Sequence, residues 1–267
     1  MSSSQKIRKV PAQKLFVSEP PPQWFGNGAN PKDFKKAGWT NGNWLKSRFH
    51  FNFAEYSSGP PNFGALRVLN DDLVQPQRMF GSHPHRDAEI LTYVVEGELT
   101  HQDSRGNKET LGKGSVQFMS AGRGITHSEG NPSDKPLRFV QTWLTPRSYG
   151  LTPNYGSAQP CDTKDNWTRV AGDWEDETAK DLKVRLHQDV NVFVSETSKP
   201  ISFDLKPNRQ AYLLCIDGHI DISEGETCNT SLERHDAAEL YGPAHLSFSP
   251  SPSAHLLMFE MAKSRRS

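Results

Sequence analysis

The sequence predicts an all-β protein, a sandwich or barrel of many short strands. Three observations indicate this class. Short runs rich in β-branched and aromatic residues recur from Phe49 onward, turns rich in Gly, Asp and Asn separate them, and no long stretch shows convincing helical periodicity. A chain of 267 residues is long enough for one large domain or two small ones.

Taken in order, residues 18 to 43 are rich in Pro, Gly and Asn and are predicted to be irregular. The runs that we expect to form strands are 64–69, 90–95, 116–119, 139–144, 192–194, 212–216 and 256–261. Turns are expected at 103–107, 111–114 and 217–218. The segment from Trp174 to Asp181 could form a short helix or a charged loop.

An internal repeat indicates two copies of one β unit. The run Val94–Thr100 resembles Cys215–Asp221, at an offset of 121 residues. The same offset aligns Leu111–Ser115 with Leu232–Asp236. We therefore expect two domains, with a boundary near residues 146 to 165.

Two pairs of residues in the first copy have the spacing of metal ligands on strands. His83 and His85 form one pair, and His127 and Glu129 form the other. On a strand, residues i and i+2 point to the same face. Two such strands side by side would bring three imidazoles and one carboxylate to one point, a set that suits a first-row transition metal.

The repeat also predicts where the metal is not bound. The offset of 121 places Asp204 and Lys206 where the first copy has the first pair, and Phe248 and Pro250 where it has the second. Lys, Phe and Pro cannot rebuild that set of ligands, so we expect the second copy to be structural. The other histidines form no such pair and are expected on the surface or in the core: 50, 101, 187, 219, 235, 245 and 255.

The composition limits the classes of binding partner and the cellular compartments that we expect. Lys and Arg together number 31, as do Asp and Glu, so no net charge favours direct binding of nucleic acid or an anionic membrane. Three distant cysteines favour a reducing compartment over a disulfide framework. No apolar run is long enough to span a membrane, and the basic segment Met1 to Phe16 lacks the apolar core of a secretory signal. We expect a cytoplasmic protein that is not secreted, with the nucleus as an alternative.

Several motifs resemble the pirin family of the cupin superfamily. They are His83–Glu89, Thr92–Gly97, His101–Ser104, Ala121–Glu129 and Gln141–Leu144. The resemblance is strong over residues 38 to 160, whereas the C-terminal half matches only in its general pattern. The runs Gly64–Asp72 and Asp87–Glu89 are closer to the bacterial quercetinase-type branch.

The resemblance implies a bicupin, with two antiparallel β-barrels of jelly-roll type packed face to face and one metal in the first. It divides the chain into an irregular arm (1–37), a metal-binding barrel (38–150) and a metal-free barrel (151–263). It assigns the metal ligands to His83, His85, His127 and Glu129. Glu89 has the right parity for the same face, but the family pattern makes it a neighbour of the site or a surface residue.

Other residues near the motifs are less specific. Phe118 and Met119 could line a pocket or pack in the core. By parity Arg86 points away from the metal, whereas Arg123 lies in a turn where parity gives no guidance. The aromatic-rich segment Trp39–Phe53 is expected to be core or barrel cover.

The family includes quercetin 2,3-dioxygenases, so the resemblance implies an Fe(II)-dependent enzyme that cleaves a flavonol-like substrate with O2 and releases carbon monoxide. Mn, Ni, Cu, Co and Zn also suit the ligands. Glu129 would be both ligand and general base for the flavonol hydroxyl. The alternative is an iron-dependent, redox-sensing transcription co-regulator that acts through protein partners in the nucleus. A third interpretation is a metal that only stabilises the barrel.

Overall fold

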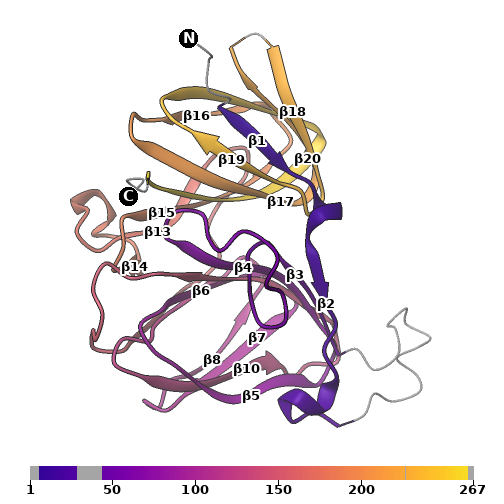
Figure 1. The fold of residues 1–267 in the computed structure, drawn as a ribbon, viewed down its shortest axis with the longest axis vertical. Coiled ribbons are helices and arrows are strands. Elements are labelled where there is room, and N and C mark those ends of the chain that lie inside the picture. Colours follow the sequence, from indigo (N-terminus) through magenta and orange to yellow (C-terminus); the bar gives the residue numbers. More distant parts are fainter. Residues whose placement is uncertain (1–5, 29–43, 226, 264–267) are drawn as a thin grey trace. The chain divides into compact units, whose positions relative to one another are not determined.

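The computed structural model describes residues 6–28, 44–225 and 227–263, without the side chains of 227–229. It confirms the predicted all-β class, because its helices are single 3-10 turns (Figure 1). The chain forms two compact units. We call the described residues among 16–62 and 66–160 the N-terminal unit, and those among 1–15, 63–65 and 161–267 the C-terminal unit.

The N-terminal unit consists of two antiparallel sheets. The larger has the order β12-β9-β6-β11-β4-β3-β2, and the smaller has the order β5-β10-β7-β8. The strands of the larger sheet are β2 (Phe16–Ser18), β3 (Leu45–Phe49), β4 (Leu66–Val74), β6 (Glu89–Glu96), β9 (Val116–Ser120), β11 (Leu137–Leu144) and β12 (Asn154–Ala158). Those of the smaller sheet are β5 (Arg78–His85), β7 (Glu98–Asp103), β8 (Lys108–Gly112) and β10 (Ile125–Asn131). A 3-10 helix, η2 (Pro22–Phe25), follows β2.

The two sheets of this unit face each other, as in a jelly-roll sandwich, and do not form one closed hydrogen-bonded barrel. Gln117 of β9 and Gln141 of β11 reach across to Glu129 of β10. The inner faces pack an apolar core around Trp44, Val94 and Phe139. The cavity described below also lies between the two sheets, because residues of both β4 and β5 line it.

The C-terminal unit is one sheet of order β1-β19-β17-β20-β15-β13-β14, to which β16 and β18 add by pairing with β20 and β17. Its strands are β1 (Ile7–Val10), β13 (Thr168–Asp173), β14 (Val184–Leu186), β15 (Val190–Thr197), β16 (Ile201–Leu205), β17 (Arg209–Glu224), β18 (Thr227–Glu233), β19 (Ala237–Tyr241) and β20 (Ala244–Ala262). The pairing is antiparallel except between β13 and β14. The long strands β17 and β20 carry two register shifts where they pair, and such irregularities let a sheet curve around its core.

Two short 3-10 helices belong to this unit, η1 (Ala12–Lys14) and η4 (Glu177–Ala179). The second lies in the charged segment for which the sequence left helix and loop open. Asp176 precedes η4 and accepts a hydrogen bond from the backbone N–H of Thr178. The segment is therefore a capped single turn.

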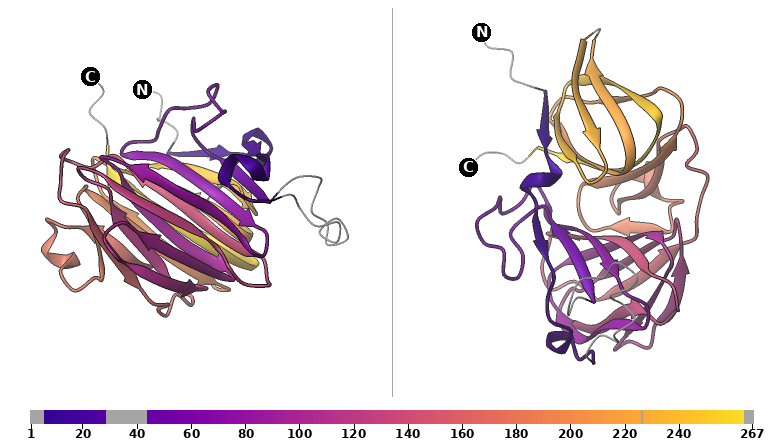
Figure 2. Two further views of the ribbon diagram at one scale, coloured as in Figure 1. Left: turned by 90° about the horizontal axis from the view of Figure 1, so that it is seen from below. Right: turned by 90° about the vertical axis from the view of Figure 1, so that its right-hand side faces the viewer.

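The described part of the predicted irregular arm contains two short strands, β1 and β2, which corrects that expectation for these residues. Residues 7–10 form β1, which lies along β19 at the edge of the C-terminal sheet, while β2 pairs with β3 in the other unit (Figure 2). Ion pairs fasten β1 in place, because Lys9 lies 2.6 Å from Asp236 and Arg8 pairs with Glu239. A strand of four residues that pairs with a segment more than 200 residues away leaves no local pattern. Residues 29–37 lie outside the described residues.

The offset of 121 residues aligns part of the C-terminal unit with the N-terminal unit, but it fails after β19. Strands β9 (116–120) and β19 (237–241) correspond at the offset of 121. In the next strand, however, Asp204 lies opposite His245, whereas His83 lies opposite His127. The predicted equivalence of Phe248 with His127 is therefore wrong by about three residues. A shorter turn accounts for two of these three residues: residues 121–124 join β9 to β10, but only residues 242 and 243 join β19 to β20.

None of the helices in the described residues combines the length and the apolar character needed to cross a membrane.

Candidate metal centre

Strands β5 and β10 bring three histidines together. His83 lies directly opposite His127 in the antiparallel register, and His85 follows on the same face of β5. The ring centroids lie 4.6 Å apart for His83 and His127, and 4.8 Å apart for each of the other two pairs. Ligand atoms of the three side chains all lie within 4.8 Å of one another. The three imidazoles therefore converge, as the spacing of the sequence motifs predicts.

The three rings also present the chemistry that a metal requires. His83 donates from Nδ1 to the carbonyl of Gly81 at 2.7 Å, which leaves Nε2 with a free lone pair, 3.1 Å from Nε2 of His127. A backbone carbonyl on the second ring nitrogen is the usual way to orient a metal-binding histidine. Burial lowers the pKa of His85 to about 3 and of His127 to about 4, so both are neutral near pH 7. Neutral, converging imidazole nitrogens fit a divalent transition metal.

Glu129 lies behind this cluster, held by the opposite sheet. The β10 register shifts between His127 and Glu129, and the carboxylate is 1% exposed. It accepts from Nε2 of Gln117 at 3.1 Å and from Nε2 of Gln141 at 2.6 Å. Burial by itself would raise the pKa of Glu129, but His127, His101 and the Gln117 amide outweigh burial and lower it to about 2. Glu129 is therefore ionised at all physiological pH values.

A fourth histidine that we expected in the core or on the surface, His101, is part of the site. It lies opposite Glu129 in the pairing of β7 with β10, and its side chain is fully buried. Ligand atoms of His101, His127 and Glu129 lie within 4.8 Å of one another, in a second cluster that shares His127 with the first. The ring of His101 stacks on Tyr155 at 4.7 Å. The sequence carried one signal for it, the i, i+2 pair of His101 with Asp103.

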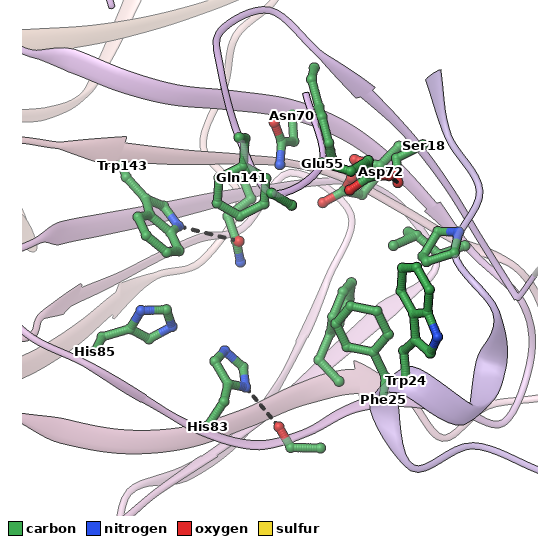
Figure 3. A pocket seen from close by; sticks show the side chains of 18 of the residues that line it. Ser18, Trp24, Phe25, Glu55, Asn70, Asp72, His83, His85, Gln141 and Trp143 are labelled. Atoms are coloured by element: carbon green, nitrogen blue, oxygen red, sulfur yellow. Dashed lines mark hydrogen bonds between the residues drawn. The ribbon is translucent and has the colours of Figure 1, made fainter. Parts of the chain in front are cut away.

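The imidazoles of His83 and His85 form one wall of a cavity of about 700 Å³ within the N-terminal unit (Figure 3). Aromatic side chains make up much of the remaining wall: Trp24, Phe25, Phe49, Phe53, Phe80 and Trp143. Trp143 packs edge-on against His85, with ring centroids 4.7 Å apart. A cavity of this size and apolar character is typical of a small-molecule site.

The sequence predicted only part of the aromatic wall of the cavity. In the segment predicted to be core or cover, Trp44 is core but Phe49 and Phe53 line the cavity; Trp39 lies outside the described residues. Conversely, Phe118 and Met119 are buried and line no part of this cavity. Pocket residues contributed by β2, η2 and β3 come from parts of the chain without a recognisable ligand motif.

The other candidates lie away from the imidazoles. Glu89 is fully buried and accepts from the Ser120 hydroxyl at 2.6 Å, so it is not a surface residue. Arg86 and Arg123 are both exposed.

In the C-terminal unit, Asp204 binds His245 at the surface and Phe248 is fully buried in the core. Among the described residues of that unit, no three His, Cys, Asp or Glu side chains gather at ligand distance.

Two β units of this topology, with a histidine-rich centre in the N-terminal one, define a bicupin. Comparison with known proteins supports this class. Residues 33–144 match the family model for pirin, and residues 176–261 match that for a quercetinase C-terminal cupin domain.

Relatives extend the match over most of the chain. A putative quercetin 2,3-dioxygenase of Zymomonas mobilis is 37% identical over 234 residues, which cover 85% of this chain and 95% of that protein. A quercetin 2,3-dioxygenase of Escherichia coli K12 is 35% identical over 230 residues, 84% of this chain and 94% of that protein. The crystal structure of the bacterial pirin YhhW from Escherichia coli, in complex with nickel(II), matches with a TM-score of 0.78 and 30% identity, covering 96% of this chain and 99% of the other.

The chain belongs to the pirin family, which confirms the resemblance found in its motifs. The family match and the converging histidines together make the N-terminal unit a metal-binding cupin.

Proposed function

We propose that this protein is a metal-dependent dioxygenase of the quercetin 2,3-dioxygenase type, which opens the central ring of a flavonol-like substrate with O2 and releases carbon monoxide. The observation that carries the proposal is the convergence of three imidazoles, two of which, those of His83 and His85, lie in the wall of an aromatic cavity, with an ionised carboxylate behind them. The names of the relatives from Zymomonas mobilis and Escherichia coli agree with it. Both relatives are bacterial, so they give no support to a nuclear co-regulator.

We assign the metal to His83, His85, His127 and Glu129, with Fe(II) as the first candidate and Mn, Ni, Cu, Co or Zn as others. When bound, such a metal would acidify a coordinated flavonol hydroxyl and supply the redox chemistry that O2 requires. Three neutral imidazoles and one carboxylate would leave a divalent ion with a net charge of +1, which suits an anionic flavonol oxygen.

Each of these side chains has a task that its surroundings explain. The Gly81 carbonyl keeps a proton on Nδ1 of His83, so that Nε2 is free. Gln117 and Gln141 hold Glu129 in one orientation and keep it ionised. Trp143 and Phe53, which pack edge to face at 5.3 Å, shield the cavity wall beside His85 from water.

Glu129 is proposed both as a ligand and as the base that receives the flavonol hydroxyl proton. The two roles make different demands. A pKa of about 2 favours an ionised ligand, whereas a general base works best with a pKa near the working pH. The ligand role therefore has the stronger physical support, and the base role needs a separate test.

The test begins with elemental analysis of bound metal. The iron-loaded protein is then given quercetin, and loss of quercetin absorbance and O2 uptake are followed in air and under argon. We expect both in air and neither under argon. If the iron-loaded protein consumes no O2, the dioxygenase proposal is refuted. Glu129→Gln should weaken iron binding and abolish turnover, whereas Glu98→Gln, on the exposed surface of β7, should change neither. Turnover by iron-loaded Glu129→Gln would show that the base assignment is wrong.

A further inference from the structure

The larger sheet of the N-terminal unit presents a second set of polar groups to the cavity, apart from the imidazoles. Asn70 of β4 lies in register between Phe49 of β3 and Gln141 of β11, and Asp72 lies two residues further along the same face, opposite Ser47. All five side chains line the cavity, and that of Gln141 also binds Glu129. Figure 3 shows Asn70 and Asp72 across the cavity from His83 and His85.

Asn70 has an unused acceptor. Its side chain is 3% exposed, and its Oδ1 atom has no hydrogen-bond partner in the described part of the chain. Leaving a buried acceptor unpaired costs about 1–3 kcal/mol, so such groups in native proteins call for an explanation. Figure 3 shows the amide nitrogen of Asn70 toward the cavity and Oδ1 turned away from it. Rotation of the amide by 180° would turn Oδ1 to a donor on a bound molecule, so this side chain can donate to a hydroxyl group or accept from it.

Asp72 adds a second polar group to the part of the cavity wall that Asn70 occupies. It is 3% exposed, and the Ser47 hydroxyl donates to it. Burial raises the pKa of Asp72 to about 8, so near pH 7 the group is mostly protonated and can donate as well as accept. Nearby at the cavity wall, the Ser18 hydroxyl donates to Glu55. This end therefore offers several acceptors and one acidic donor.

The charge of the lining selects among ligands. The described residues that line the cavity include two acidic side chains, Asp72 and Glu55, and no Lys or Arg. A carboxylate, sulfate or phosphate on the ligand would meet no cation there and would lie near carboxyl groups. A hydroxyl group, which can exchange hydrogen bonds with Asn70 and with Asp72, fits without charge. The aromatic wall between the two ends suits a flat ring.

We propose that Asn70 and Asp72 form a subsite that binds hydroxyl groups of an uncharged aromatic ring, at the end of the substrate remote from His83 and His85. The inference rests on the proposed function, because it takes this cavity as the substrate site. It narrows the substrate class to neutral polyphenols that carry hydroxyl groups besides the one that reacts. Phenols with anionic substituents at the remote end are excluded.

The test measures equilibrium binding, not turnover. Metal-loaded protein under argon is titrated with quercetin and with 3-hydroxyflavone, which keeps the reactive hydroxyl but lacks all others, and tryptophan fluorescence is recorded. One to two hydrogen bonds predict that the wild type binds quercetin about tenfold more tightly. A ring-sulfonated quercetin should bind at least about tenfold more weakly than quercetin itself. Similar affinities for quercetin and 3-hydroxyflavone, or tight binding of the sulfonate, would overturn the subsite.

Variants then locate the effect. Asn70→Leu should reduce the affinity ratio of the two flavonols to near one, and Asn70→Ala gives the same comparison if the leucine variant does not fold. Asp72→Asn, which keeps a donor and an acceptor, should preserve most of the ratio. Asn154→Leu is the matched control, because Asn154 lies exposed on β12 of the same sheet and lines no part of the cavity. An unchanged ratio in Asn70→Leu would refute the assignment.

The outcomes separate this inference from the proposed function. If the affinity ratio is found and depends on Asn70, but the iron-loaded protein consumes no O2 with quercetin, the subsite stands and the dioxygenase proposal fails. If quercetin is turned over and the ratio is near one, the subsite fails and the dioxygenase proposal stands.

Discussion

Replacing Asp72 by Asn should change how the stability of the N-terminal unit depends on pH. Burial, with smaller contributions from the charges of Asp71 and Glu129, raises the pKa of Asp72 to about 8, although the Ser47 hydroxyl opposes the shift. In the unfolded chain the carboxyl has its ordinary pKa of 3.8. Between these two values the folded state holds a proton that the unfolded state has lost. The wild type therefore loses stability as the pH rises from about 4 to about 8, and Asp72→Asn does not.

The size of the effect follows from the two pKa values. With 1.36 kcal/mol per pKa unit, Asp72 costs the folded state about 2 kcal/mol at about pH 5 and about 5 kcal/mol at about pH 7.5. All other ionisable groups are shared by the two proteins and cancel in the comparison. The stability gained by Asp72→Asn relative to the wild type should thus grow by about 3 kcal/mol over this interval.

Urea unfolding followed by hydrogen exchange of peptides from β3 and β4 measures this difference, and it avoids the assumption that a chain of two units unfolds in one step. Ser47→Ala is a useful companion variant, because it removes the one hydrogen bond that favours the ionised form. If the difference in unfolding free energy between wild type and Asp72→Asn stays constant between about pH 5 and about pH 7.5, Asp72 is ionised in the folded protein. The assignment of an uncharged Asp72 to the cavity wall would then be wrong.

Two further predictions concern buried hydrogen bonds. Gln141→Leu removes the 2.6 Å bond to Glu129 and should weaken metal binding about 10- to 100-fold, as measured by competition with a chelator; unchanged affinity would mean that Gln141 does not position the carboxylate. Arg138→Met leaves Asp71, 1% exposed, without its two-pronged partner and should destabilise the N-terminal unit by about 3–5 kcal/mol in urea unfolding. The exposed control Arg86→Met should cost less than about 0.5 kcal/mol, and equal losses in the two variants would contradict the role of the buried pair.

The local patterns of the sequence predict the strands and the histidine cluster because both depend on short spacings. Alternation with period two places His83 and His85 on one face, and pairing with β10 adds His127. His101 was not predicted as a site residue because its place there depends on the pairing of β7 with β10, which sets it opposite Glu129, 28 positions away in sequence. The i, i+2 pair of His101 with Asp103 is visible in the sequence, but it does not show that the pair lies beside β10.

The cavity could not be predicted for a related reason. Its walls come from β2, η2, β3, β4, β5 and β11, so they are a property of the packing between two sheets. The sequence shows Asn70 and Asp72 at i, i+2 spacing, but only the register opposite Phe49 and Ser47 reveals which face they occupy.

The repeat shows a third limit of sequence reasoning. An offset of 121 is valid for the strands before the turn at 242–243, where no residue has been gained or lost. A turn shorter by two residues then accounts for most of the three-residue shift that places His245, and not Phe248, opposite Asp204. Similar sequences flank the turn, and the change in its length shows only in the pairing.

The most direct test of the proposed chemistry is the stoichiometry of the gas exchange. Iron-loaded protein is mixed with quercetin in air, and O2 consumed, flavonol lost and carbon monoxide formed are measured together, with Glu129→Gln as the control. We predict one O2 consumed and one carbon monoxide released for each flavonol cleaved, and neither with the variant. Loss of flavonol without carbon monoxide, or equal release by Glu129→Gln, would contradict a dioxygenase centred on His83, His85, His127 and Glu129.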